Sequence, residues 1–95
     1  MAGYKLTRAA DADLAGLYRH GVTTFGAARA DRYFDSLVAE LERIAAHPGM
    51  YQRSEYRDGY RRAAHPPHTI YFRALEDGAV LVVRILYGQD PREAL

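Results

Sequence analysis

The amino-acid sequence predicts an α+β fold in which an antiparallel helical hairpin packs on one face of a mostly antiparallel four-stranded sheet. Apolar residues recur with a helical period through the first half of the chain and alternate as in strands through much of the second half. A Glu76-Asp77-Gly78 turn between the last two apolar runs adds a hairpin signal. The resulting order is strand, helix, helix and three strands, which is typical of helices gathered on one side of an antiparallel sheet.

Residues 4–8 open the chain as a short strand in which apolar and polar residues alternate. Thr7, or Asp11 after it, can cap a first helix that runs to about Phe25. A second helix is expected from about residue 27 to residue 46, because its apolar residues form a 3.6-residue stripe. The stripe comprises Ala30, Tyr33, Phe34, Leu37, Leu41, Ile44 and Ala45.

Three strands are expected at about residues 59–65, 68–75 and 79–87. Two consecutive prolines separate the first two strands, and their missing backbone donors place the turn at an end of the sheet. The tail beyond Gly88 has turn residues and then a single helical turn or a loose end.

With 95 residues, 48% of them hydrophobic, the chain has the size and composition of one folded domain spanning residues 1–95. It contains no cysteine, which excludes disulfides and thiolate metal sites and is typical of a reducing compartment. No apolar run is long enough for a signal peptide or for a membrane span. We therefore expect a cytoplasmic protein without a membrane role.

The net charge is only +1, but twelve of the thirteen basic residues are arginine. Residues 51–73 contain five arginines against Glu55 and Asp58, so this stretch carries a charge of +3. Guanidinium groups suit bidentate pairing with phosphates or carboxylates. A phosphate site, an acidic-peptide site and a merely solvated surface all stay open for this stretch.

The sequence contains no Gly-rich phosphate loop, no G-x-S-x-G elbow and no H-E-x-x-H motif. His65 and His68 are separated by two prolines rather than by a helical i, i+4 interval, so we expect neither a metal site nor a cofactor. Both histidines could serve as general acids or bases, but the sequence favours a solvent-exposed turn in which nothing orients them.

The strand expected at residues 79–87 is apolar on both faces, which predicts a partner for the sheet face away from the helices. Alternation places Arg61 and Arg62 on opposite faces of the sheet. We expect Arg61 to share the open face with Arg84 and to form a basic site there.

An ordered set of short motifs along nearly the whole chain resembles the ParE toxins of the RelE/ParE superfamily. The set comprises Ala9 or Ala10 with Asp13-Leu14, then Gly26, Ala30 and Tyr33, then Leu41, Ile44 and HPGM at 47–50, GYRR at 59–62, the strand at 68–73 and RILYGQDPREAL at 84–95. Each motif is weak alone, and their order carries the resemblance.

The resemblance implies the toxin of a type II toxin–antitoxin system, held inactive in a tight complex with a ParD-type antitoxin. ParE-type toxins act on DNA gyrase, whereas RelE-type relatives cut mRNA in the ribosomal A site, and DNA would be contacted only through the antitoxin. Three functions stay open in this order: a gyrase-poisoning toxin, a ribosome-dependent mRNA endonuclease, and a non-toxic member that only binds an antitoxin.

RNA cleavage needs an acid, a base and cations on the phosphate. The lysines of the RelE branch are missing here, and Tyr87 stands where many ParE sequences have histidine. A phenol needs a large pKa change to act as a base near neutrality, so we favour gyrase binding without catalytic residues. The expected target-binding residues are Arg61, Arg84, Tyr87, Asp90 and Arg92; in an RNase, Arg61, Arg84 and Tyr87 would be the catalytic candidates.

The antitoxin is expected to wrap the helical hairpin and the adjacent sheet, with an amphipathic segment in a groove edged by apolar helix residues. The expected antitoxin-binding residues are Leu14, Leu17, Tyr18, Tyr33 and Leu37 from the helices, with Arg61 and Arg73 from the sheet. The alternative, in which the five helix residues face the sheet as core, stays open.

Overall fold

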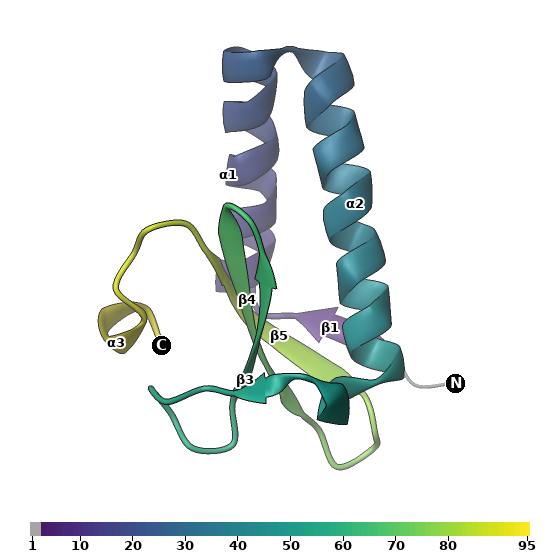
Figure 1. Ribbon diagram of the computed structural model, residues 1–95, viewed down its shortest axis with the longest axis vertical. Helices are drawn as coiled ribbons and strands as arrows, with labels where there is room; N and C mark the ends of the chain where they lie inside the picture. Colours follow the sequence, from purple (N-terminus) through teal and green to yellow (C-terminus); the bar gives the residue numbers. More distant parts are fainter. Residues whose placement is uncertain (1–2) are drawn as a thin grey trace.

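Two long helices stand against one face of a five-stranded sheet in the computed structural model, which describes residues 3–95 (Figure 1). The elements are β1 (Tyr4–Leu6), α1 (Arg8–Phe25), α2 (Ala27–Ala46), the 3-10 turn η1 (Pro48–Met50), β2 (Gln52–Arg53), β3 (Arg61–His65), β4 (His68–Ala74), β5 (Val80–Leu86) and α3 (Pro91–Ala94). The strand order is β1-β5-β4-β3-β2, with β1 parallel to β5 and the other pairs antiparallel. The predicted α+β class is confirmed.

The sheet has five strands rather than the four predicted. The additional strand, β2, pairs two residues with β3, so that Gln52 lies opposite Arg62 and Arg53 opposite Arg61. A two-residue strand in polar sequence has no alternation to reveal it. Its pairing depends on the 54–60 loop, which returns the chain to the sheet edge.

Thr7 joins the first strand to the first helix. Its hydroxyl oxygen accepts a hydrogen bond from the Ala10 N–H at 3.0 Å and donates to the Val83 carbonyl at 2.7 Å. One side chain therefore caps α1 and ties the start of that helix to β5. At the far end a single residue, Gly26, connects α1 to α2 with a φ of 90°, a conformation that favours glycine.

The core lies between the helical hairpin and the inner face of the sheet. Its largest fully buried side chains are Phe72, Leu37, Leu41, Ile44, Ile70, Val80 and Val82. The strand members lie in register on one face, with Phe72 opposite Val82 and Ile70 opposite Ile85. The closed end of the helical hairpin projects beyond the sheet (Figure 1), and Phe25 at that end is 58% exposed.

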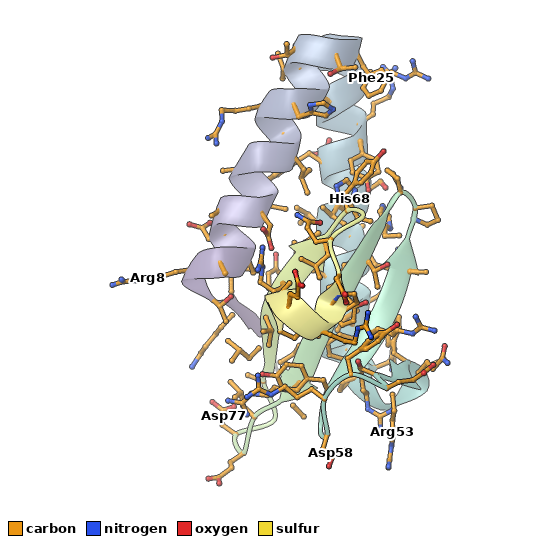
Figure 2. All side chains as sticks on the ribbon, turned by 90° about the vertical axis from the view of Figure 1, so that its left-hand side faces the viewer. Arg8, Phe25, Arg53, Asp58, His68 and Asp77 are labelled. Carbon is orange, nitrogen blue, oxygen red and sulfur yellow. The ribbon has the colours of Figure 1, made fainter. Side chains whose placement is uncertain are left out.

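The chain's own C-terminal segment covers part of the outer face of the sheet. The short helix α3, the yellow helix in the foreground of Figure 2, lies in front of the strands. The Arg57 guanidinium donates to the Leu95 carbonyl at 2.7 Å. Tyr71 projects from the outer face and yet is only 4% exposed. The expectation of an open outer face is therefore wrong at its centre.

Asp13 of α1 binds β5 beyond the end of β1. Its carboxylate accepts two hydrogen bonds from the Arg84 guanidinium, each at 2.8 Å, and one from the Ile85 backbone N–H at 2.9 Å. The hydrogen bond to Asp13 raises the pKa of Arg84, against the opposing effect of partial burial. The same guanidinium also donates to the Ala94 carbonyl at 3.4 Å. Asp13 and Arg84 together connect α1, β5 and α3.

Replacing Asp13 by asparagine should loosen this junction without changing side-chain shape. Asp13→Asn keeps an oxygen for the Ile85 N–H and removes the charge that holds Arg84, so the free energy of unfolding should fall by about 1–3 kcal/mol. Amide hydrogen exchange at Ala94 and Leu95 should become faster. The matched control is Asp35→Asn, an exposed position on α2, which should change stability by less than about 0.5 kcal/mol. Equal urea-unfolding curves for both variants would refute the role of Asp13.

Candidate functional site: a groove beside the helical hairpin

A groove of about 550 Å³ lies between the helical hairpin, the turn that joins β3 to β4, and the residues that follow β5. Leu17 of α1, Tyr33 of α2 and Ile85 of β5 give it a largely apolar lining. Two of its lining residues mark its extent in Figure 2: Phe25 lies at the closed end of the helical hairpin, and His68 lies nearer the sheet. A surface of this shape suits an extended or helical apolar segment.

The sheet end of the groove is built from uncharged aromatic groups. The Tyr33 hydroxyl donates to the His65 carbonyl at 3.1 Å and lies 2.6 Å from Nδ1 of His68. The ring of Tyr87 meets the His68 ring edge-on, with centroids 5.5 Å apart. Burial raises the pKa of Tyr33 to about 12. Burial also lowers the pKa of His68, and the nearby His65 lowers it further, against an opposing effect of Asp13. Both directions favour neutral side chains at this end of the groove.

His65 belongs to a second polar cluster, on the side of α2. Nε2 of its ring lies 2.8 Å from the Ser36 hydroxyl, and Nδ1 lies 3.4 Å from the Glu40 carboxylate. This order matches that of a Ser-His-acid triad, but Ser36 lies inside α2, where neighbouring backbone N–H groups are used in helical hydrogen bonds. The Glu40 carboxylate also accepts a hydrogen bond from the Tyr51 hydroxyl at 2.8 Å. The cluster therefore ties β3 and the chain after η1 to α2.

The expectation that the two histidines lie in solvent with nothing to orient them is therefore wrong. Their partners, Tyr33, Ser36 and Glu40, precede them by 25 to 35 residues. Such contacts are invisible to an analysis of local spacing, although the three partners do recur at helical intervals on α2.

Five helix residues were expected to edge an antitoxin-binding groove. Two of them, Leu17 and Tyr33, line the groove described here. Leu14 and Leu37 are core residues, with exposures of 8% and 0%, so the prediction that they edge an open groove is wrong. Tyr18 lines a separate hollow with Ala15, Asp31 and Phe34. The helical spacing of the apolar residues was predicted correctly, but this spacing does not distinguish a residue in the core from one that lines a groove.

The predicted pairing of Arg61 and Arg84 on one open face is wrong. Arg61 lies opposite Phe72 and so projects from the inner face, where its guanidinium donates to the Tyr51 carbonyl at 2.6 Å. Arg84 lies opposite Tyr71, in register with Arg62 across β4. The side chains of Arg61 and Arg84 therefore project from opposite faces of the sheet, and their strands, β3 and β5, are not neighbours.

The tail residues are placed differently from one another. Tyr87 is 60% exposed and lines the groove. Asp90 caps α3 by accepting a hydrogen bond from the Arg92 N–H at 2.9 Å, and it also pairs with the Arg92 guanidinium at 2.9 Å. Asp90 and Arg92 are therefore paired with each other, whereas Tyr87 lines the groove, and the expected role of all three in target binding stays a prediction. Arg73 lies on β4, outside the groove.

Two groove residues at the tip of the helical hairpin, Phe25 and Arg29, were not predicted as site residues from the sequence. Phe25, the last residue of α1, is 58% exposed. The Arg29 guanidinium lies over its ring, 5.2 Å from the centroid, and both residues line the groove. The position of Phe25 beside Gly26 is the only signal in the sequence, because it places the ring at the end of the helical hairpin rather than over the sheet.

Among residues 3–95, no helix has a stretch both long and apolar enough to span a bilayer. No cluster of three or more metal-binding side chains occurs within the same range.

Comparison with known proteins places this architecture in a family. Residues 4–91 match the family model described as ParE toxin of type II toxin-antitoxin system, parDE. The chain is 38% identical over 88 residues to Toxin ParE1 of Caulobacter vibrioides, covering 92% of this chain and 90% of that protein.

Two solved structures share the fold. A chain of the chromosomal ParDE system from P. aeruginosa superposes with a TM-score of 0.80 at 24% identity, covering 94% of this chain and 98% of that one. A chain of the RelBE2 toxin-antitoxin complex from Mycobacterium tuberculosis gives a TM-score of 0.66 at 16% identity, covering 90% and 96%. These two structures show the shared fold. The family model and the Caulobacter relative show that the chain belongs to the ParE toxin family of type II toxin–antitoxin systems.

Proposed function

We propose that this ParE-family toxin acts by binding DNA gyrase through the exposed residues after β5, and that a ParD-type antitoxin neutralises it by occupying the groove beside the helical hairpin. The observation that carries the proposal is the continuity of the two surfaces. Tyr87 and Gln89 line the groove and also begin the segment that leads to Asp90 and Arg92. An antitoxin segment in the groove would therefore cover the start of the target-binding segment.

The chemistry of the groove suits an amphipathic helix as its occupant. The lining is apolar along the middle, where Leu17, Tyr33 and Ile85 meet. Asp13 also lines it, but its carboxylate is already used by Arg84. Arg29 at the tip of the helical hairpin is exposed and therefore supplies a cation for an acidic residue of the antitoxin.

Binding is favoured over RNA cleavage because the residues considered for cleavage do not form one site. The Arg61 guanidinium is engaged by the Tyr51 carbonyl on the inner face, and that of Arg84 by Asp13. Of the three, only Tyr87 is largely exposed, at 60%. A gyrase-directed toxin would act in the cytoplasm, where bacterial DNA is supercoiled.

The first test is ATP-dependent supercoiling by purified bacterial gyrase. The folded toxin should inhibit the reaction, and the cognate antitoxin should relieve the inhibition. Tyr87→Ala and Arg92→Ala should each weaken inhibition by about 10-fold, as expected for loss of a central contact. Arg32→Ala removes an exposed charge from α2 and serves as the control.

Unchanged supercoiling in the presence of a folded toxin that still binds its antitoxin would exclude gyrase as the target. Ribosome-dependent mRNA cleavage would then be measured with the same variants.

The groove can be tested by filling it. Gly16 lines the groove, and a Cβ added there meets no atom within 4 Å. Gly16→Leu should therefore keep or raise stability, since glycine is unfavourable inside a helix, while it lowers antitoxin affinity by about 10-fold or more. Affinity is measured by calorimetry and stability by thermal unfolding.

The matched control is Ala15→Leu, which adds bulk at the neighbouring position, in the separate hollow beside Tyr18. Equal affinities for wild type and Gly16→Leu would exclude this groove as the antitoxin site.

A further inference from the structure

We propose that His68 makes the groove sensitive to pH, so that protonation of its ring weakens the binding of the apolar antitoxin segment and acidification favours the free toxin. This inference rests on the proposed antitoxin site and adds a means of regulating it. It is carried by the position of His68 in the groove wall and by the hydrogen bonds around its ring.

His68 is the first residue of β4 and lines the groove at its sheet end (Figure 2). Its ring meets the Tyr87 ring edge-on, with centroids 5.5 Å apart, and the centroid of the Tyr33 ring on α2 also lies 5.5 Å away. The residue is partly exposed, so water still reaches it. A segment that fills this end of the groove would therefore cover a ring that is hydrated in the free toxin.

The hydrogen bonds of Tyr33 determine where a second proton on His68 would go. A phenol has one proton to donate, and the Tyr33 hydroxyl donates it to the His65 carbonyl at 3.1 Å. The same oxygen therefore accepts from Nδ1 of His68, which lies 2.6 Å away. The neutral ring then carries its proton on Nδ1 and has a lone pair on Nε2. Protonation of Nε2 would turn a neutral residue of the groove wall into a cation.

The carboxylate near this ring is already in use. Asp13 on α1 favours the protonated form of His68. Its oxygens, however, accept two hydrogen bonds from the Arg84 guanidinium and one from the Ile85 N–H. Among residues 3–95, His68 takes part in no ion pair with a carboxylate. A cation at this position would therefore be only weakly compensated.

The other groups around the ring do not favour a positive charge. Burial lowers the pKa of His68, and His65 on β3 lowers it further. Tyr33 stays neutral, because burial raises its pKa to about 12. His20 and Arg29, which line the groove nearer the tip of the helical hairpin, would add positive rather than negative charge. The protonated ring is thus disfavoured even before a partner binds.

A bound apolar segment would displace the water that reaches His68. Loss of water disfavours a charged imidazole, so the pKa of His68 should be lower in the complex than in the free toxin. The complex would then bind fewer protons at this site than the free toxin, and its affinity would fall as the pH decreases through the pKa of the free toxin. Above that pKa, affinity would not depend on the protonation of His68. Below it, affinity would fall by up to about 10-fold per pH unit until the lower pKa of the complex is reached.

The first measurement is the affinity of the toxin for its cognate ParD-type antitoxin, by calorimetry from about pH 7.5 to about pH 5.0, over the range in which thermal unfolding shows both proteins folded. His68→Gln keeps an amide that can hydrogen-bond to Tyr33 but does not become charged, so its affinity follows only the other titrating groups of the two proteins. Over this range the wild-type affinity should fall by about 3-fold or more beyond that of His68→Gln. The matched control, His47→Gln, removes an exposed histidine outside the groove and should keep the wild-type pH dependence.

The second measurement follows the titration of the His68 ring by NMR in the free toxin and in the complex. The ring should titrate at a lower pH in the complex. An equal or higher titration pH in the complex would overturn the inference, as would the same pH dependence of affinity in the wild type and in His68→Gln. An affinity that rises on acidification would indicate an acidic antitoxin residue beside His68 and would overturn it as well.

The variant Gly16→Leu separates failure of this inference from failure of the proposed antitoxin site. If Gly16→Leu weakens binding and His68→Gln leaves the pH dependence unchanged, the groove is occupied and only the pH sensitivity is refuted. If Gly16→Leu has no effect on binding, the proposed antitoxin site is refuted and this inference with it.

Discussion

The carboxylate of Asp13, set against the free edge of β5, holds the two halves of this molecule together. β1 pairs with only the first part of β5, and the first helix then passes the remaining edge. Without a partner there, the Ile85 N–H and the charge of Arg84 would both be left partly buried and unsatisfied, which is costly. By accepting from both, Asp13 satisfies the edge and directs the Arg84 side chain toward the Ala94 carbonyl. A residue in the first helix therefore helps to position the tail, together with Arg57, which donates to the Leu95 carbonyl.

That junction places the groove and the tail on one contiguous side of the molecule. The groove lies on the helical-hairpin side of Asp13, and the residues after β5 continue from the groove wall to α3. A toxin that is released from its antitoxin needs a target surface that the antitoxin can cover. If the antitoxin occupies the groove as proposed, one bound segment would contact both the groove and the beginning of the tail.

The two faces of the sheet have different electrostatic character for a simple geometrical reason. On the inner face, charged side chains must be paired, since they lie beside the core, as Arg61 illustrates through its bond to the Tyr51 carbonyl. On the outer face, Lys5 is exposed and Arg73 is partly exposed, so both side chains stay in contact with water. Cations without an ion-pair partner can therefore persist on this face.

The sequence by itself determined the elements whose causes are local. The second helix matches its predicted bounds because its apolar period, the Gly26 break before it and the Pro48 stop after it all lie within the segment itself. The ordered motifs likewise indicated the ParE family without any structure. These features depend on residues close together in the chain, where spacing carries the information.

Tertiary structure decided which of these residues are available for function. Arg61 and Arg62 are adjacent, so a shift of one residue in strand register exchanges their faces, and the local sequence does not determine that register. Leu37 and Tyr33 belong to one apolar stripe, yet one is buried in the core and the other lines the groove, because the helical hairpin is longer than the sheet that covers it. The Arg84 guanidinium is paired with Asp13, which lies 71 residues earlier in the chain. The register of the strands, the burial of helix residues by the sheet and the pairing of residues such as Asp13 and Arg84 arise only when the chain is folded. Each depends on contacts between segments that are far apart in sequence.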